Sequence, residues 1–241
     1  MPVRQLLTLL FLCAVSMIAE AAPARPEALV FHAVQPGRQA LDAGDGGGNP
    51  FASALIEVLG RPSADLKTMA AEIERLTSLK SSRHMVADVP QVGTQGSWSL
   101  VPARAGERRV ALVLVVSDYS RAGAQSLPGA RHDAARVVAA LSAAGFETES
   151  TLDLDAAAMR HRLETFARRS AEADAAIIYT TGHGVEVGNR VYLLPADFPV
   201  AHGREALQSR AVVLADIAGS LRARKINLVF FGGCRDDPFG N

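Results

Sequence analysis

Cys234 and His183 are the residues whose types and neighbours best suit nucleophilic chemistry. Cys234 follows the apolar run "NLVFFGG", and His183 stands between two glycines in "YTTGHG", 51 residues earlier. A thiolate is a strong nucleophile, and an imidazole with a pKa near ~6.5 can take the thiol proton and return it to a leaving amine. We therefore predict attack on a carbonyl, with Gly184 allowing close approach and the Cys234 N–H helping to bind the oxyanion.

Both residues follow short apolar segments that are typical of buried strands, 174–181 and 225–231. Reactive groups in α/β sheets gather at the carboxyl ends of parallel strands, so the imidazole and the thiol would meet if these strands are neighbours. The other histidines show no metal-ligand spacing, and we predict no metal site and no cofactor. They are His32, His84, His132, His161 and His202.

The elements around this pair alternate between strand and helix patterns, which predicts a mostly parallel sheet covered by helices. After residue 108 we expect strands at 109–116, 147–151, 174–181 and 225–231, helices at 134–144, 154–173 and 214–222, and a hairpin at 185–195 around Gly188-Asn189. Before it we expect strands at 27–34 and 92–102 and helices at 50–62 and 64–79. The N-terminal third has too little apolar surface for its own core, so we assign residues 27–241 to one domain.

Composition narrows the class of partner. The 241 residues are 49% hydrophobic, and Lys+Arg and Asp+Glu both number 25, so the formal net charge is zero. A nucleic-acid-binding protein normally carries a basic excess or stripe, so we expect no nucleic-acid partner.

The first 21 residues resemble an export signal. Arg4 supplies the positive charge, Leu6 to Ile18 is apolar, and Ala19 to Ala21 offers a small-residue cleavage pattern. The apolar run is shorter than the ~20 residues of a membrane-spanning helix, although an uncleaved anchor is the alternative. We expect an exported protein, periplasmic or secreted, with no stable membrane insertion. Cys13 would leave with the signal, so Cys234 would be either a buried hydrophobe or a nucleophile.

Several segments resemble the caspase-like cysteine peptidases, in particular the bacterial relatives of caspases and metacaspases. They are "RRVALVLVVSDY", "LPGARHDAARVVAALSAAGFE", "DLDAAAMRHRLETFA", "ADAAIIYTTGHGVEVGNRVYLLPAD" and "NLVFFGGCRDDPF", which together span residues 109–239. The resemblance implies a three-layer α/β/α fold with a mostly parallel six-stranded sheet, a Cys234–His183 dyad and protein or peptide substrates. It leaves the calcium requirement and the oligomeric state open.

The order of the segments departs from that family. Residues 29–59 resemble the start of the small subunit, and 96–100 resemble its last strand, yet both precede the catalytic segment. We therefore expect a circularly permuted domain, with a small-subunit-like segment at 22–102, a linker at 103–108 and a catalytic segment at 109–241. The residues "PARAGER" can reach about 23 Å, enough to cross four strand spacings of about 19 Å. With no cleavable linker after Cys234, we expect no internal processing.

The walls of the substrate site also depart from the family pattern. Bacterial relatives usually carry an acid two residues before the cysteine, where this chain has Gly232. Asp118, Asp42 and Asp45 are the acids that could replace it, although each could equally be a solvated loop residue. The family's "YYAGHG" reads "YTTGHG" here, and we expect that change to be neutral.

The leading hypothesis is an exported cysteine-type endopeptidase. A non-catalytic interaction or regulatory module on the same fold is the alternative, because Gly232 replaces the usual acid. A plain α/β domain with a buried cysteine is the third. Reaction of Cys234 with a peptidyl electrophile separates the first hypothesis from the other two.

Overall fold

The computed structural model describes residues 25–44, 46–61, 65–101 and 103–240. The predicted export signal and Asp45 lie outside the described residues. Among the described residues, no helix combines the length and apolarity that crossing a bilayer requires.

The central sheet has five parallel strands in the order β1-β8-β4-β2-β3. Its inner strands β2, β4 and β8 are buried along their whole length, as their continuous apolar sequences predict. The strands are β1 (Leu29–His32), β2 (Arg109–Val115), β3 (Glu147–Leu152), β4 (Ala175–Thr181) and β8 (Ile226–Phe231).

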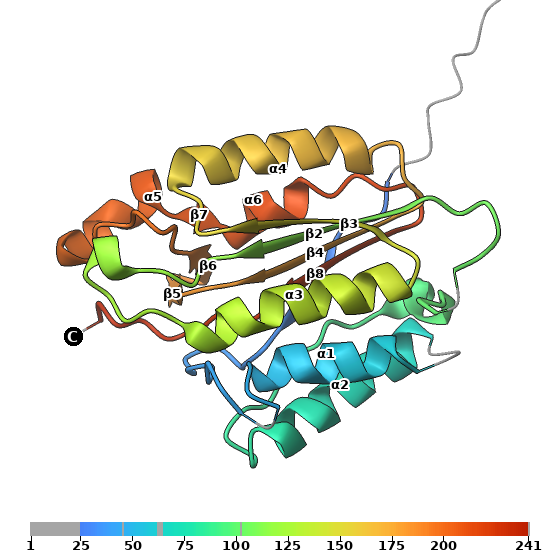
Figure 1. Ribbon diagram of the computed structural model, residues 1–241, viewed down its shortest axis with the longest axis horizontal. Helices are drawn as coiled ribbons and strands as arrows, with labels where there is room; N and C mark the ends of the chain where they lie inside the picture. The colour runs from blue at the N-terminus through green and yellow to red at the C-terminus, as the bar shows by residue number, and fades with distance from the viewer. Residues whose placement is uncertain (1–24, 45, 62–64, 102, 241) are drawn as a thin grey trace, which may run out of the picture.

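Helices cover both faces of the sheet (Figure 1). Along β4, Ile177 and Tyr179 pack into the core under α1, α2 and α3, whereas Ala176 and Ile178 pack into the core under α4 and α6. This arrangement confirms the predicted three-layer α/β/α class with a mostly parallel sheet. The helices are α1 (Pro50–Leu59), α2 (Leu66–Lys80), α3 (Pro128–Ala143), α4 (Ala156–Ser170) and α6 (Leu214–Gly219).

A small antiparallel sheet stands beside the end of β4. Its strands are β5 (Gly184–Val187), β6 (Arg190–Leu193) and β7 (Val212–Val213), with the short helix α5 (Leu207–Arg210) before β7. The predicted hairpin is confirmed. Gly188 and Asn189 both have left-handed backbone angles, with φ of 57° and 61°, as a two-residue hairpin turn requires.

The strand predicted at 92–102 is wrong, and in the described residues the main sheet has five strands rather than six. Gly93–Ser97 forms a 3₁₀ helix, η1, and Ser99 makes only an isolated bridge to Asp65. The buried Arg109 guanidinium binds the carbonyls of Ser99 and Leu100 and stacks on the Trp98 ring at 5.1 Å. Because Arg109 takes these carbonyls, the segment is held without a neighbouring strand.

The N-terminal segment packs as an integral part of the domain. β1 is the first strand of the described chain and pairs in parallel with β8, the last. α1 and α2 share one apolar core with α3 and the sheet. The outer edge of β1 meets Asp88 in a two-bond bridge from His32, with N···O distances of 2.9 Å.

Candidate active site

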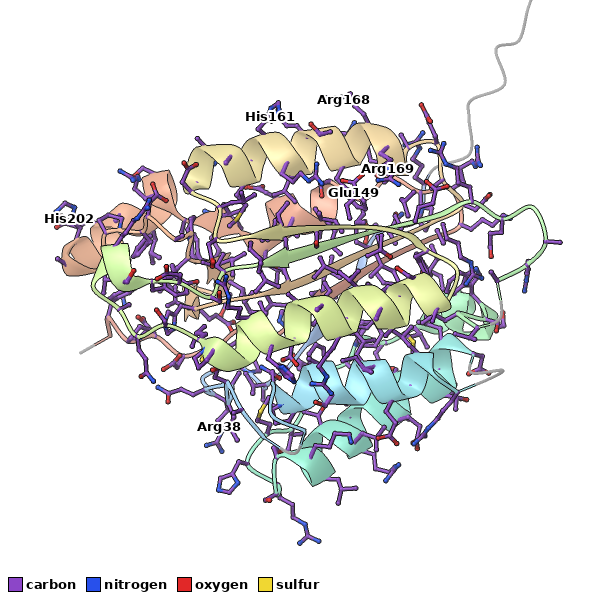
Figure 2. All side chains as sticks on the ribbon, in the orientation of Figure 1. Arg38, Glu149, His161, Arg168, Arg169 and His202 are labelled. Carbon is purple, nitrogen blue, oxygen red and sulfur yellow. The ribbon has the colours of Figure 1, made fainter. Side chains whose placement is uncertain are left out.

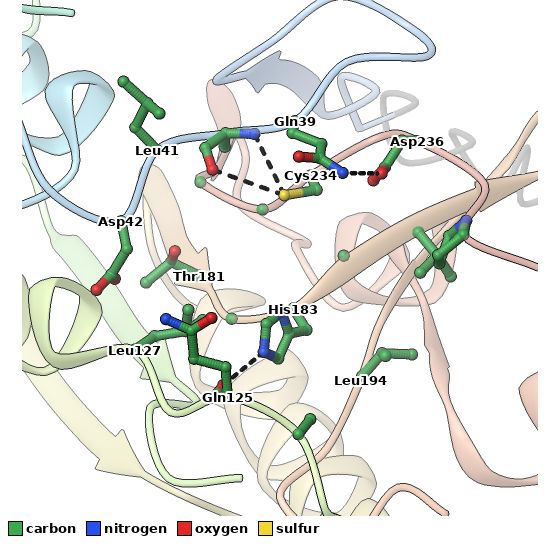
Figure 3. A pocket seen from close by; sticks show the side chains of 18 of the residues that line it. Gln39, Leu41, Asp42, Gln125, Leu127, Thr181, His183, Leu194, Cys234 and Asp236 are labelled. Carbon is green, nitrogen blue, oxygen red and sulfur yellow. Dashed lines mark hydrogen bonds between the residues drawn. The ribbon is translucent and has the colours of Figure 1, made fainter. Parts of the chain in front are cut away.

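Adjacent strands bring Cys234 and His183 to one edge of the sheet. β4 and β8 are neighbours with Thr180 opposite Phe231, so the residues that follow them emerge side by side. Both line a cavity of about 480 Å³, in which Figure 3 shows the thiol and the imidazole. The predicted pair is therefore brought together at one site.

The Cys234 thiol is half-buried and covered by Ala40. Sγ accepts a hydrogen bond from the Ala40 N–H at 3.2 Å. Two backbone bonds hold this covering segment in place, Gly37 N to Arg235 O at 2.9 Å and Arg235 N to Arg38 O at 2.8 Å. Burial raises the pKa of the thiol, the Ala40 N–H opposes that rise, and the Asp236 carboxylate adds to it. The resting sulfur is consequently a neutral thiol at pH 7 and needs a base.

His183 is oriented for that role. One ring nitrogen, Nε2, lies 2.7 Å from the Gln125 carbonyl oxygen. A carbonyl only accepts hydrogen bonds, so Nε2 carries the proton and Nδ1 of the neutral ring keeps its lone pair. Among the described residues, no hydrogen bond joins this ring to Cys234 Sγ, as is common before substrate binds.

Tyr119 fixes the position of His183, and the sequence analysis missed it. Its ring packs on the imidazole with 4.5 Å between centroids. Its hydroxyl accepts a hydrogen bond from the His183 N–H at 2.9 Å and donates to the Leu194 carbonyl at 2.7 Å. The side chain is fully buried, which raises the pKa of the phenol. The only sequence signal was an aromatic residue just after the end of β2.

Gly184 lies directly against the backbone of Cys234. A Cβ atom at Gly184 would stand 2.5 Å from the Cys234 carbonyl oxygen and 2.7 Å from the Phe231 ring, so only glycine fits. Among the described residues, no backbone carbonyl accepts a hydrogen bond from the Cys234 N–H, which keeps it a candidate donor to an oxyanion.

Asn49 connects the nucleophile loop to two helices and was also missed. Its side-chain Nδ2 donates to the Gly232 carbonyl at 3.1 Å, and its Oδ1 caps α1 through the Phe51 N–H at 2.8 Å. Its backbone N–H donates to the buried Asp133 carboxylate of α3 at 2.7 Å. The available signal was an Asn-Pro pair before an apolar run, which marks a helix start. Ala40 and Gln125 act through backbone atoms, so their residue types carried no signal.

Of the acidic residues predicted to line the substrate site, Asp42 lines the cavity and Asp118 does not. Asp42 lines the cavity, but both its carboxylate oxygens accept N–H groups at the start of α3, from Gly129 and Ala130 at 2.8 Å each. Asp118 is exposed and lies outside the cavity lining; its carboxylate accepts the Ser120 N–H at 2.9 Å, which lowers its pKa.

The charged side chains among the described lining residues are both acidic. They belong to Asp42 and Asp236, and the lining includes no Lys or Arg. Asp236 accepts a hydrogen bond from Gln39 at 2.6 Å. In the part of the chain that the structure describes, no three His, Cys, Asp or Glu side chains are grouped closely enough to hold a metal ion.

Comparison with known proteins identifies the family. The caspase domain family matches residues 108–241, more than half of the chain. Caspase-1 from Spodoptera frugiperda is a similar solved structure at 16% sequence identity, with a TM-score of 0.41; the match covers 52% of this chain and 46% of that one. No curated protein matches the chain. The chain thus belongs to the caspase domain family of cysteine peptidases.

Proposed function

We propose that this protein is an exported endopeptidase that cleaves peptide bonds through Cys234 and His183. The observation that carries the proposal is the orientation of the pair. Both side chains face one cavity at the ends of adjacent strands, and the Gln125 carbonyl leaves His183 Nδ1 free to act as the base.

The reaction follows from the groups in place. His183 Nδ1 removes the thiol proton as Sγ attacks the substrate carbonyl carbon, and the Cys234 N–H binds the resulting oxyanion. The tetrahedral intermediate collapses when His183 returns its proton to the leaving amine, which leaves a thioester on Cys234. His183 then deprotonates a water molecule that attacks the thioester, which releases the new carboxyl terminus and restores the thiol.

Proton transfer must occur in the substrate complex rather than in a preformed ion pair. Burial raises the pKa of the free thiol, and Sγ is hydrogen-bonded to Ala40 instead of the imidazole. A substrate that takes the place of Ala40 would release Sγ toward His183. Tyr119 and Gln125 keep the ring in place during this exchange.

Purified mature protein and a panel of fluorogenic peptides test the activity. The residue whose carbonyl is attacked is P1, and the panel varies it among Arg, Lys, Asp and small residues. The acidic lining predicts that P1 Asp is the poorest substrate. Cys234→Ala and His183→Ala should each abolish turnover, whereas His202→Ala, on the exposed η3 turn (Val200–Ala206), serves as the matched control.

The non-catalytic alternative also has an observation in its favour. Ala40 covers the thiol, and Gly232 supplies no carboxylate to the cavity. Such a module would turn over no peptide and would leave Cys234 unmodified by peptidyl chloromethyl ketones at neutral pH.

Circular permutation is part of the same proposal. It is supported by the parallel pairing of β1 with β8 and by the contribution of Ala40, Asp42 and Asn49 to the cavity. A rearranged chain with residues 25–102 placed after 103–241 through a flexible linker should fold and cleave the same peptides. An insoluble or unfolded product, with the parent chain folding normally, would argue against permutation. Full activity without internal cleavage is expected.

Export can be tested with residues 1–21 alone. Fused to a phosphatase that folds only outside the bacterial cytoplasm, they should give an active reporter. Leu10→Arg interrupts the apolar run and should abolish the signal. Equal reporter activity with and without this substitution would contradict export through this segment.

A further inference from the structure

A buried threonine lines the active-site cavity, and an unpartnered tyrosine hydroxyl lies two residues before it on the same strand. Thr181 is the last residue of β4, is 3% exposed and lines the cavity. Tyr179, two positions earlier on the same face of β4, carries a fully buried hydroxyl that has no hydrogen-bond partner among the described residues. A threonine hydroxyl can both donate and accept a hydrogen bond, so Thr181 is suited to bind a polar ligand group in this cavity.

Thr181 occupies the space beside Gly232. A Cβ atom at Gly232 would stand 2.7 Å from Thr181 Oγ1 and 3.0 Å from Thr181 Cβ. A side chain at 232 and the present side chain at 181 therefore compete for one volume, and the two positions are coupled. The threonine in "YTTGHG" thus fills space that a side chain at position 232 would need.

Thr181 and Gly232 line the same cavity as the two catalytic residues. Thr181 comes two residues before His183, and Gly232 comes two residues before Cys234, on adjacent strands. In Figure 3, Thr181 lies between Asp42 and His183, and all three residues line the cavity. A substrate whose carbonyl reaches Sγ would direct its P1 side chain onto this part of the cavity.

The charges around this part of the cavity disfavour an ion at P1. Asp42 is the nearby carboxylate, and the N-terminus of α3 already compensates its charge through two N–H groups. The other lining carboxylate, Asp236, lies beyond Cys234 in Figure 3 and not beside Thr181. A cationic P1 side chain beside Thr181 would therefore lose its hydration without a free counter-charge there, and a P1 carboxylate would face Asp42. Gly232 adds no charge. This part of the cavity is therefore suited to a neutral group that exchanges hydrogen bonds with the Thr181 hydroxyl.

We propose that Thr181 is the specificity-determining residue of this site and that it selects an uncharged, hydrogen-bonding P1 side chain such as Gln. The proposal rests on the peptidase function above. The Thr181 hydroxyl would contact the P1 side chain, and the absence of a side chain at Gly232 leaves space for Thr181.

The wild type, two variants and four peptides test the role of the Thr181 hydroxyl. Peptides with P1 Gln, norleucine, Arg or Asp are cleaved by the wild type, Thr181→Val and Thr181→Ser. We expect a Gln-to-norleucine ratio in kcat/KM of about tenfold or more in the wild type, because a buried polar group left unpaired is costly. Thr181→Val keeps the volume and should reduce the ratio to about one, while Thr181→Ser should retain most of it. An unchanged ratio in active Thr181→Val, or a tenfold preference for Arg over Gln in the wild type, overturns the proposal.

A stability measurement tests the shared volume independently of activity. Gly232→Ala should lower the Tm of the wild type markedly and that of Thr181→Ala much less, because removal of Oγ1 and Cγ2 leaves only the 3.0 Å approach to Cβ. Equal losses in both backgrounds overturn the coupling. In contrast, stable protein that cleaves no peptide and does not react at Cys234 contradicts the peptidase function itself.

Discussion

His32, which is half-buried, and Asp133, which is fully buried, are titratable groups whose effects on stability oppose each other. Burial and, after it, the nearby Arg235 lower the pKa of His32 to about 4, while Asp88 works in the other direction. The imidazole lies at the end of β1 against the Phe231 ring, with 6.0 Å between centroids, and its Nδ1 has no partner among the described residues.

Burial has the opposite effect on the pKa of Asp133, because it disfavours the charged form of each group. Its carboxylate is fully buried under the nucleophile loop, and burial raises its pKa to about 6. The Asn49 N–H at 2.7 Å and Arg136 at 2.9 Å oppose that rise. Gly48 packs so closely on the carboxylate that a Cβ there would stand 1.9 Å from Oδ1.

The sign of each contribution follows from which state binds more protons. Between pH 6.5 and about 4, unfolded His32 is protonated and the folded imidazole is not, so its contribution to stability is lost as the pH falls. Between pH 3.8 and about 6, folded Asp133 is protonated and the unfolded carboxyl is not, so stability is lost as the pH rises. At about 1.4 kcal/mol per pH unit, each titration changes the free energy of unfolding by about 3 kcal/mol, and the two changes nearly cancel.

Single variants should separate the two effects. In urea titrations from pH 4 to 7.5, the free energy of unfolding of His32→Leu relative to the wild type should rise by about 3 kcal/mol on acidification from pH 7 to pH 4. For Asp133→Asn, the free energy of unfolding relative to the wild type should instead fall on acidification over the same range. Parallel pH curves for the wild type and His32→Leu would refute the assignment of His32 as a buried neutral imidazole.

Three further substitutions test the positioning of the site and the fold. Tyr119→Phe leaves the His183 N–H and the Leu194 carbonyl unpaired, and it should lower kcat about tenfold with little change in KM; an unchanged kcat contradicts the positioning role. Arg235→Met leaves the carboxylates of Glu186 and Asp88 without their ion-pair partner and should lower the free energy of unfolding, measured by chemical denaturation, by about 3 kcal/mol. A decrease below about 1 kcal/mol refutes the stabilising role of these ion pairs. Arg109→Met should release the segment around Ser99, which would exchange its amide protons faster than β2 does. Amide protection around Ser99 equal to that of the wild type contradicts the role of Arg109 in holding this segment.

Much of the fold could be predicted because buried strands leave a strong sequence pattern. The runs that became β2, β4 and β8 are continuous and apolar, and their alternation with helices predicted the parallel sheet. The placement of Cys234 and His183 followed from topology alone, since both come just after such runs. The prediction of a strand at 92–102 was wrong because an alternating pattern indicates an extended chain but not what its backbone binds. Here the Arg109 side chain, and not a neighbouring strand, binds the backbone carbonyls.

The details of the site could be predicted less well. Ala40 and Gln125 act through main-chain atoms, which any residue type provides. The role of Asp42 depends on α3 beginning at Pro128, whereas apolar spacing marked that helix only from residue 134. The competition between Thr181 and Gly232 for one volume is a distance between two strands, and one sequence contains no such distance.

The most direct test of the central claim is the reaction of the mature protein with a peptidyl chloromethyl ketone at neutral pH, followed by peptide mapping and residual turnover. We predict one equivalent bound at Cys234, loss of all peptide cleavage in proportion, and neither labelling nor turnover in Cys234→Ala. Peptide cleavage that persists in Cys234→Ala at the wild-type rate would contradict the assignment of Cys234 as the nucleophile.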